Sequence, residues 1–336
     1  MILHPAVIAL VIGSALVCLM ILTASFFACR IAASWDPQSG SEKQIGLEKK
    51  TYLVSMLVAY AFGFQILSFF LFIYTADDLH GLFAGAMCGA GTLNVNRYAY
   101  PSLTVKAAAF ILAGLWLIMN HADSLGRDYP LTRAKYLFLL LLAPLVLADV
   151  FFEGAFFVNL KADVITSCCG SLFSSGETAS KGSLSAVADL PVGPLKCAFY
   201  GSGLLTLVSG TLFLLGFRRL GVFFSASSSA FFMASAAAFV SFLCLYFYEL
   251  PTHHCPFCIL QGDYHSIGYL LYGALFGGAV SGLGVGLLAP FGRVKSLAAS
   301  LPPLQKRLSA MSLILYFIFI AIVAWQMLHT DFVLDP

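Results

Sequence analysis

A series of long apolar windows, almost free of charge, constrains this chain more than any other feature. A helix needs about 20 mostly apolar residues to cross a membrane, and eight windows approach or exceed that length. They run over Ala6–Ala33, Tyr52–Ala76, Ser102–Asn120, Tyr136–Val158, Cys197–Phe217, Val222–Tyr248, Ile267–Leu288 and Leu308–Leu328. Hydrophobic residues make up 60% of the chain and charged residues 10%, far from the composition of a soluble domain. The sequence therefore predicts an all-α, polytopic membrane helix bundle with eight transmembrane helices.

The windows indicate one integral membrane domain over residues 1–336. A faint likeness between LFIYTADDLHGLFAGAMCG and LYFYELPTHHCPFC favours a weak organisation into two halves, 1–160 and 197–336, joined by an outer loop at 161–196. No Lys or Arg precedes the first window and no small-residue cleavage site follows it. We expect that window to remain attached as a membrane anchor.

The basic residues predict how the chain is oriented, because short loops that stay in the cytoplasm retain Lys and Arg. The first, third, fifth and seventh connections hold thirteen of the eighteen Lys and Arg residues. Both termini and the second, fourth and sixth loops are therefore expected to be extracytoplasmic. We interpret the chain as a multi-pass protein of a bacterial inner membrane, in contact with lipid, with functional loops on the periplasmic side. A net charge of +2 without a basic face excludes a nucleic-acid partner.

The cysteines and histidines gather on this predicted outer side. Seven of the nine cysteines lie in outer loops or near the outer ends of helices, as do six of the seven histidines. In an oxidising compartment, thiols form disulfides, transfer electrons by thiol–disulfide exchange or bind metal. Three cysteines lie inside apolar windows, where a buried free cysteine with a structural role is the favoured interpretation. These are Cys18, Cys29 and Cys244.

The segment Cys255-Pro256-Phe257-Cys258 is the strongest chemical motif in the chain. If the seventh helix begins near these residues, its positive dipole end lowers the thiol pKa values, with Cys255 the more reactive sulfur. Two intervening residues also allow a small disulfide ring to open and close, as thiol exchange requires. His253 and His254 precede the pair and are candidates to stabilise a thiolate or move its proton. A static disulfide that ties the loop is the structural alternative.

The stretch CPFCILQ at 255–261, followed by a tyrosine-rich apolar run, resembles the Cys-Pro-Leu-Cys-Ile-x-Gln segment of the bacterial disulfide-bond formation protein B family. It is also similar to bacterial vitamin K epoxide reductase homologues. The resemblance implies a thiol:quinone oxidoreductase in which Cys255 and Cys258 are the quinone-proximal pair and Gln261 lies beside them. Those families have four or five helices and an Arg after the Gln, where this chain has Gly262. Further expected quinone contacts are His254 and Arg97.

Such an enzyme needs a second thiol pair on an outer loop to accept electrons from a periplasmic thiol protein. The fourth loop, rich in Ser and Gly, offers Cys168 and Cys169, and the second loop offers Cys88 among small residues. A short re-entrant turn around Cys88 would let that thiol face the others. The connectivity of any disulfide is open, and a flexible loop with one structural bridge is equally compatible.

Two acidic residues interrupt the fourth window. Asp149 and Glu153 are four residues apart, so they share one helix face. Charges inside a membrane are expensive and commonly functional. We expect them either to relay protons for the redox reaction or to form a structural ion pair with Lys106 of the third window.

Other functions remain open for the same residues. A metal site for zinc or copper would use some of His253, His254, Cys255, Cys258 and His265. Covalent haem c attachment is disfavoured because Ile259 stands where that motif needs His, whereas a noncovalent haem held by outer histidines stays open. A non-catalytic membrane subunit of a transporter or respiratory complex, with structural disulfides, is the third possibility.

Overall fold

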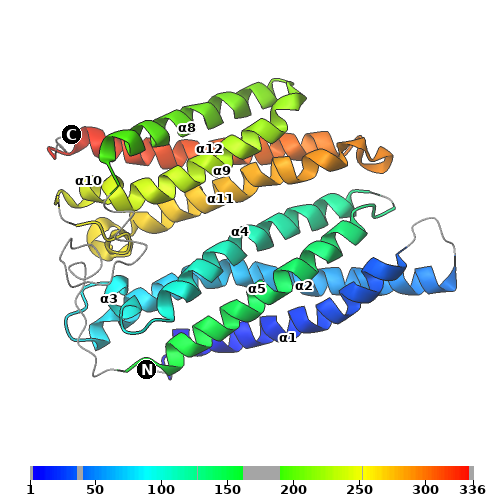
Figure 1. The fold of residues 1–336 in the computed structure, drawn as a ribbon, viewed down its shortest axis with the longest axis horizontal. Coiled ribbons are helices and arrows are strands. Elements are labelled where there is room, and N and C mark those ends of the chain that lie inside the picture. Colours follow the sequence, from blue (N-terminus) through cyan, green and yellow to red (C-terminus); the bar gives the residue numbers. More distant parts are fainter. Residues whose placement is uncertain (1–2, 36–40, 127, 162–189, 252, 333–336) are drawn as a thin grey trace. The chain divides into compact units, whose positions relative to one another are not determined.

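The computed structural model describes residues 3–35, 41–126, 128–161, 190–251 and 253–332 (Figure 1). This part of the chain is helical and contains no β-strand. Eight helical segments in it are long and apolar enough to cross a membrane. The predicted all-α class and the number of apolar helices are confirmed.

The spanning segments follow the predicted windows, and most of them extend beyond at least one end of their window. They are built from α1 (Pro5–Ser34), α2 (Glu42–Asp78), α4 (Ala99–Ser124), α5 (Thr132–Val158), α8 (Val192–Leu214), α9 (Gly221–Ala238) with the π-helix η3 (Phe239–Leu243) and α10 (Cys244–Tyr248), α11 (Ile267–Leu288) and α12 (Leu301–His329). Short elements connect them: η1 (Leu79–Leu82), α3 (Gly89–Leu93), η2 (Arg218–Leu220), η4 (Cys258–Leu260), η5 (Gly262–Tyr264), η6 (Ala289–Arg293) and η7 (Lys295–Leu297).

Contacts within the chain group it into two compact units. Unit 1 contains residues 1–75, 96–160 and 287–305, and unit 2 contains residues 76–95, 161–286 and 306–336. The segment 76–95, with η1 and α3, therefore belongs to unit 2 although most of unit 1 follows it in sequence.

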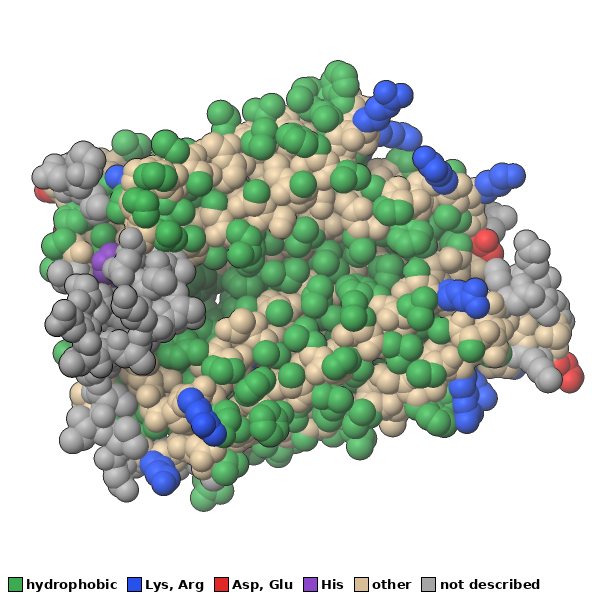
Figure 2. All heavy atoms as spheres, in the orientation of Figure 1, with side chains coloured by type: hydrophobic (Ala, Val, Ile, Leu, Met, Phe, Trp, Pro, Cys, Tyr) green, Lys and Arg blue, Asp and Glu red, His purple; other side chains and the backbone are tan. Residues whose placement is uncertain are grey.

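In unit 1, α5 packs against both α1 and α4 (Figure 1). The core side chains of α1 recur every three or four residues, as Val17, Ile21 and Ala24 show. The opposite face is just as apolar: Leu16 and Leu19 are 56% and 62% exposed. Figure 2 shows hydrophobic side chains covering the flanks of the helices, as a surface against lipid requires, and basic side chains toward helix ends.

In unit 2, small residues let the helices approach closely. Gly282 and Gly286 of α11 face α9, where a Cβ atom would lie 2.2 Å from Ser228 Oγ and 2.4 Å from Ser225 Oγ, respectively. One turn earlier, a Cβ at Gly278 would lie 2.7 Å from the Tyr316 ring of α12. Glycines four residues apart commonly line the contact between two membrane helices. In lipid the hydrophobic effect does not drive helices together, so they associate through close packing of this kind.

Candidate thiol site

Three of the cysteines predicted to carry redox chemistry lie together in unit 2. The Sγ atoms of Cys88 and Cys255 are 3.6 Å apart, across a sequence separation of 167 residues. With Cys258 they form a group whose three Sγ atoms all lie within 4.8 Å of one another. All three side chains are buried. We call this group, Cys88, Cys255 and Cys258, the three-sulfur cluster.

The cluster forms where two connections between spanning helices meet. Cys88 lies between the second and third spans, and Cys255 and Cys258 lie between the sixth and seventh. A chain that crosses the membrane at every span places all even-numbered connections on one side. The fourth connection holds Cys168 and Cys169, which lie outside the described residues.

The position of Cys88 depends on a close approach between two backbone segments of unit 2. The carboxylate of Asp77, at the end of α2, accepts a hydrogen bond of 2.9 Å from the backbone N–H of Gly89. A Cβ at Gly89 would lie 3.2 Å from the Asp77 nitrogen and 3.3 Å from its Cα, which is backbone and cannot rotate away. Glycine after Cys88 is therefore part of what presents this sulfur to the cluster.

Two tyrosines hold the turn that carries Cys255 and Cys258. The Tyr248 hydroxyl, at the end of α10, donates to the Cys255 carbonyl at 2.6 Å and accepts from the Ile259 N–H at 2.9 Å. The Tyr272 hydroxyl of α11 donates to the carbonyl of Pro256. Because their rings are largely enclosed by the protein, these bonds fix the turn from both neighbouring helices.

The seventh helix begins at Ile267, as its apolar window predicts. The condition for a lowered thiol pKa, a helix that begins near the cysteines, is not met. Cys258 instead begins the short 3-10 turn η4, and α11 starts only at Ile267. Between them the backbone passes through η5 and through two left-handed residues, His265 and Ser266, with φ of 54° and 53°. The cysteines are therefore not part of the first turn of α11, on which the expected lowering of the thiol pKa depended.

The three histidines near the motif have different surroundings. His253 Nε2 lies 3.2 Å from Cys258 Sγ, and its ring stands edge-on to Tyr248 at 4.4 Å between centroids. His254 Nδ1 contacts the Val240 carbonyl at 3.0 Å, in the π-helix η3. His265 is exposed. His253 is thus the imidazole best placed to exchange a proton with the cluster.

The residues expected to contact a quinone lie in both units. In unit 2, Gln261 donates from Nε2 to the Met87 carbonyl at 2.8 Å, which joins the two loops that carry the cysteines. In unit 1, Arg97 is exposed and donates to the hydroxyl of Tyr98 at 3.0 Å, and this bond raises the pKa of its guanidinium. Quinone contact by either residue stays a prediction.

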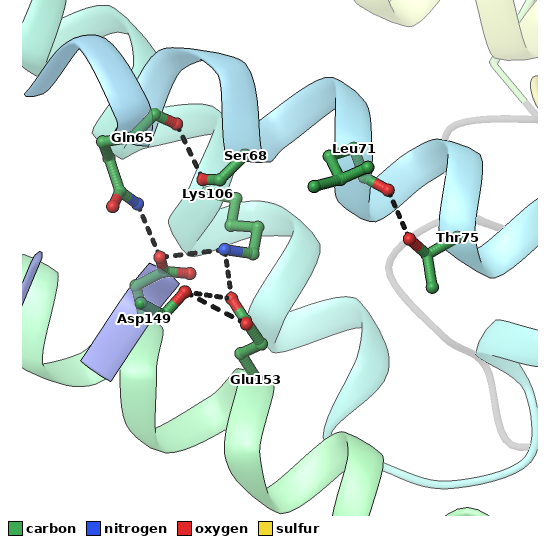
Figure 3. A network of polar contacts seen from close by, with 8 residues as sticks. Gln65, Ser68, Leu71, Thr75, Lys106, Asp149 and Glu153 are labelled. Atoms are coloured by element: carbon green, nitrogen blue, oxygen red, sulfur yellow. Dashed lines mark hydrogen bonds and ion pairs between the residues drawn. The ribbon is translucent and has the colours of Figure 1, made fainter. Parts of the chain in front are cut away.

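The acidic pair expected to relay protons lies in unit 1 and is ion-paired with Lys106, the partner weighed from the sequence. Lys106 Nζ is 3.0 Å from Asp149 Oδ2 and also contacts Glu153 (Figure 3). The pairing is therefore present, and a proton-relay role stays a prediction.

Sequence reasoning missed the residues that build the thiol site around its sulfurs. Tyr248 and Tyr272 carry no motif of their own, although both stand close in sequence to the cysteine pair. Gly89 follows Cys88 directly. Only the structure shows why a glycine is needed there, because the Asp77 backbone lies where a side chain would begin. Comparisons with protein-family models, with curated proteins and with solved structures find no match for this chain.

Proposed function

We propose that the chain is a membrane thiol–disulfide redox protein that passes electrons between periplasmic thiols and a membrane quinone. The observation that carries the proposal is the contact of Cys88 with Cys255 beside Cys258. Three sulfurs within 4.8 Å are close enough for one disulfide to move between them with small displacements. The local resemblance of CPFCILQ to thiol:quinone oxidoreductases supports the same chemistry.

The exchange step follows from the geometry. When a disulfide joins Cys255 to Cys258, the Cys88 thiolate attacks Cys255 Sγ, the bond to Cys258 breaks, and its electron pair leaves on the sulfur of Cys258. His253 Nε2, 3.2 Å from that sulfur, supplies the proton that the leaving thiolate takes up. This exchange leaves one disulfide and one thiol in the cluster. A periplasmic dithiol then reduces the disulfide to two thiols and itself becomes a disulfide. The cluster is reoxidised when its two thiols give two electrons and two protons to a quinone, which becomes a quinol.

The test is a count of thiols in detergent-purified protein. Reduced protein is mixed with a quinone, trapped with an alkylating reagent, and the cysteines that escape alkylation are identified by mass spectrometry. We expect two cysteines of the cluster to become oxidised only when quinone is present. Cys255→Ser removes the sulfur that takes part in both disulfides of the proposed exchange. Quinone-dependent oxidation of the remaining cluster cysteines should then fall to the background rate seen without quinone.

The matched control is Cys197→Ser, which changes an exposed cysteine of α8 in the same unit. This variant should react as the unmodified chain does. Oxidation that continues in Cys255→Ser, or a cluster that stays fully oxidised under reductant, would refute an exchanging dithiol and leave a structural bridge.

A soft-metal site is the second candidate, favoured by the same three buried sulfurs. No histidine joins the tight group among the described residues, and three thiolates without a fourth ligand suit Cu(I) better than zinc, which takes four. Elemental analysis decides between the readings. Stoichiometric copper that protects the thiols from alkylation, with no response to quinone, would replace the redox proposal. A haem would appear as an absorption band.

The location of this chemistry is part of the proposal. The excess of Lys and Arg in the odd-numbered connections supports a bacterial inner-membrane protein whose thiol site opens to the periplasm. A periplasmic thiol protein is the partner that this side makes available. Association with further membrane subunits belongs to the alternative in which the chain is a non-catalytic component.

A further inference from the structure

Unit 1 contains a second polar centre, buried among its spanning helices. Lys106 of α4 lies between Asp149 and Glu153 of α5, and their side chains are 0%, 0% and 1% exposed. Ser14 of α1 lies 2.9 Å and 3.0 Å from the two carboxylate oxygens of Glu153, and Gln65 Nε2 of α2 donates to Asp149 Oδ2 at 2.5 Å (Figure 3). We call these five residues the carboxylate site.

The charges of the carboxylate site do not balance. Its titratable groups are one amine and two carboxyls, while α1 and α2 contribute only a hydroxyl and an amide in the contacts described. With every group ionised, the site carries one net negative charge. An uncompensated charge in a low-dielectric interior is costly, and proteins generally avoid it by binding a proton or a counter-ion.

The hydrogen bonds of the site show the same deficit. Asp149 Oδ1 and Gln65 Oε1 are buried acceptors with no donor in the described part of the chain, and Ser102 Oγ, one turn before Lys106, is also without a partner. Buried polar atoms are normally paired, so the two unpaired acceptors of the site, Asp149 Oδ1 and Gln65 Oε1, indicate that it takes up a hydrogen-bond donor.

We propose that the carboxylate site binds one exchangeable proton, shared between Asp149 and Glu153 with Lys106 as the internal counter-charge. A single proton cancels the net charge and turns one carboxyl oxygen from an acceptor into a donor. Water would pair the orphan oxygens but leave the charge. A metal cation would have to bind against the ammonium of Lys106, which already lies 3.0 Å from Asp149 Oδ2.

A second buried ion pair in unit 1 shows what a balanced site looks like. Lys135 Nζ lies 2.6 Å from Asp123 Oδ2, with one charge of each sign. Asp123 Oδ1 accepts from the Leu131 N–H at 2.7 Å, and Oδ2 also accepts from the Thr132 hydroxyl at 3.1 Å. This carboxylate has its donors and its counter-charge, so it calls for no additional proton.

Binding and release of that proton would change the net charge of the carboxylate site between zero and one negative charge. The inference gives unit 1 a proton-coupled role that does not rest on thiol chemistry, because the carboxylate site contains no sulfur. Failure of the redox proposal therefore leaves this one standing, and the reverse also holds.

The experiment is infrared difference spectroscopy on the full chain in lipid vesicles, across a pH titration and in heavy water. A protonated carboxyl has a C=O band separate from that of a carboxylate. We expect one such carboxyl from the site, with a band that shifts in heavy water and disappears at high pH. Asp149→Asn and Glu153→Gln should each abolish it, because either change leaves one acid balanced by Lys106.

Two further variants sharpen the result. Lys106→Met removes the counter-charge, so two protonated carboxyls are expected in place of one. Asp123→Asn is the matched control, and it should leave the band intact because its own carboxylate is already balanced. Should a variant fail to fold, the titration of the unmodified chain decides alone whether an exchangeable buried carboxyl exists.

Several outcomes would overturn the inference. These are an unmodified chain without such a band, a band that neither Asp149→Asn nor Glu153→Gln removes, and a band that does not shift in heavy water. A band that added Na⁺ abolishes at constant pH would instead identify the carboxylate site as a metal-cation site.

Discussion

At the scale of single residues, the thiol site depends on backbone contacts as much as on its sulfurs. Tyr248 shows this most clearly, since one hydroxyl satisfies both the Cys255 carbonyl and the Ile259 N–H, on either side of Cys258. Its side chain is 6% exposed, so water does not readily take its place. A buried backbone group that loses its partner costs about 1–3 kcal/mol.

We therefore expect Tyr248→Phe to loosen the cysteine turn. The free energy of unfolding should fall by about 1–3 kcal/mol, and Cys255 should be alkylated faster than in the unmodified chain. The measurements are thermal unfolding in detergent and the time course of alkylation. Tyr264→Phe is the control, because that ring packs against Tyr248 at 4.9 Å while its hydroxyl makes no bond to the turn in the contacts described. A Tyr248→Phe variant as stable and as slowly alkylated as Tyr264→Phe and the unmodified chain would show that the hydroxyl does not hold the turn.

At the scale of elements, unit 2 is organised by the glycine face of α11. Gly278, Gly282 and Gly286 stand one turn apart and receive Tyr316, Ser228 and Ser225 from the neighbouring helices. The Tyr316 hydroxyl and the Ser228 hydroxyl are 2.9 Å apart, so a polar contact accompanies the close packing. This face determines how near α9 and α12 come to α11, whose first residues follow the cysteine turn.

A methyl group at the centre of this face should separate the helices. We expect Gly282→Ala to lower the free energy of unfolding by about 1–3 kcal/mol, because overpacking forces a backbone shift. Gly273→Ala, on the same helix with nothing within 4 Å of the added carbon, should be neutral or slightly stabilising. Chemical or thermal unfolding in detergent compares the two. A neutral Gly282→Ala would mean that Ser228 rotates away and the helices are not held by this contact.

At the scale of the whole molecule, the orientation of the chain decides which compartment meets the thiol site. The two ends of the sixth span provide a test, because Arg219 and Leu250 are both exposed and lie on opposite sides of its apolar stretch. The excess of Lys and Arg in the odd-numbered connections predicts that Arg219 lies in the cytoplasm and Leu250 outside.

Labelling of intact cells with a membrane-impermeant maleimide checks this. With Cys29, Cys168, Cys169 and Cys197 changed to serine, Leu250→Cys should be labelled in intact cells and Arg219→Cys only after permeabilisation. The opposite pattern would place the three-sulfur cluster in the reducing cytoplasm, where stable disulfides are rare, and would remove the periplasmic partner from the proposed function.

The number and approximate extent of the spanning helices were readable from the chain because each needs an uninterrupted apolar window. The start of α11 at Ile267 was among them, whereas the turn between Cys258 and that helix, with left-handed backbone at His265 and Ser266, was not. The candidate cysteines could be predicted from their motif and their distribution along the chain. The roles of Tyr248, Tyr272 and Gly89 could not, because hydrogen bonds and a close backbone contact between distant segments leave no pattern in the sequence.

By itself, the sequence determined that this is a helical membrane protein with eight apolar helices, because length and hydropathy are local properties. It also singled out Cys88, Cys255, Cys258, Asp149 and Glu153, because sulfur and charge are rare in such a chain. Only the tertiary structure decided that Cys88 meets Cys255, that Lys106 lies between two acids, and that one oxygen of Asp149 has no donor among the described residues. The physical reason is that spanning helices are apolar on every face, so no periodicity reveals which side packs inward and which side meets lipid.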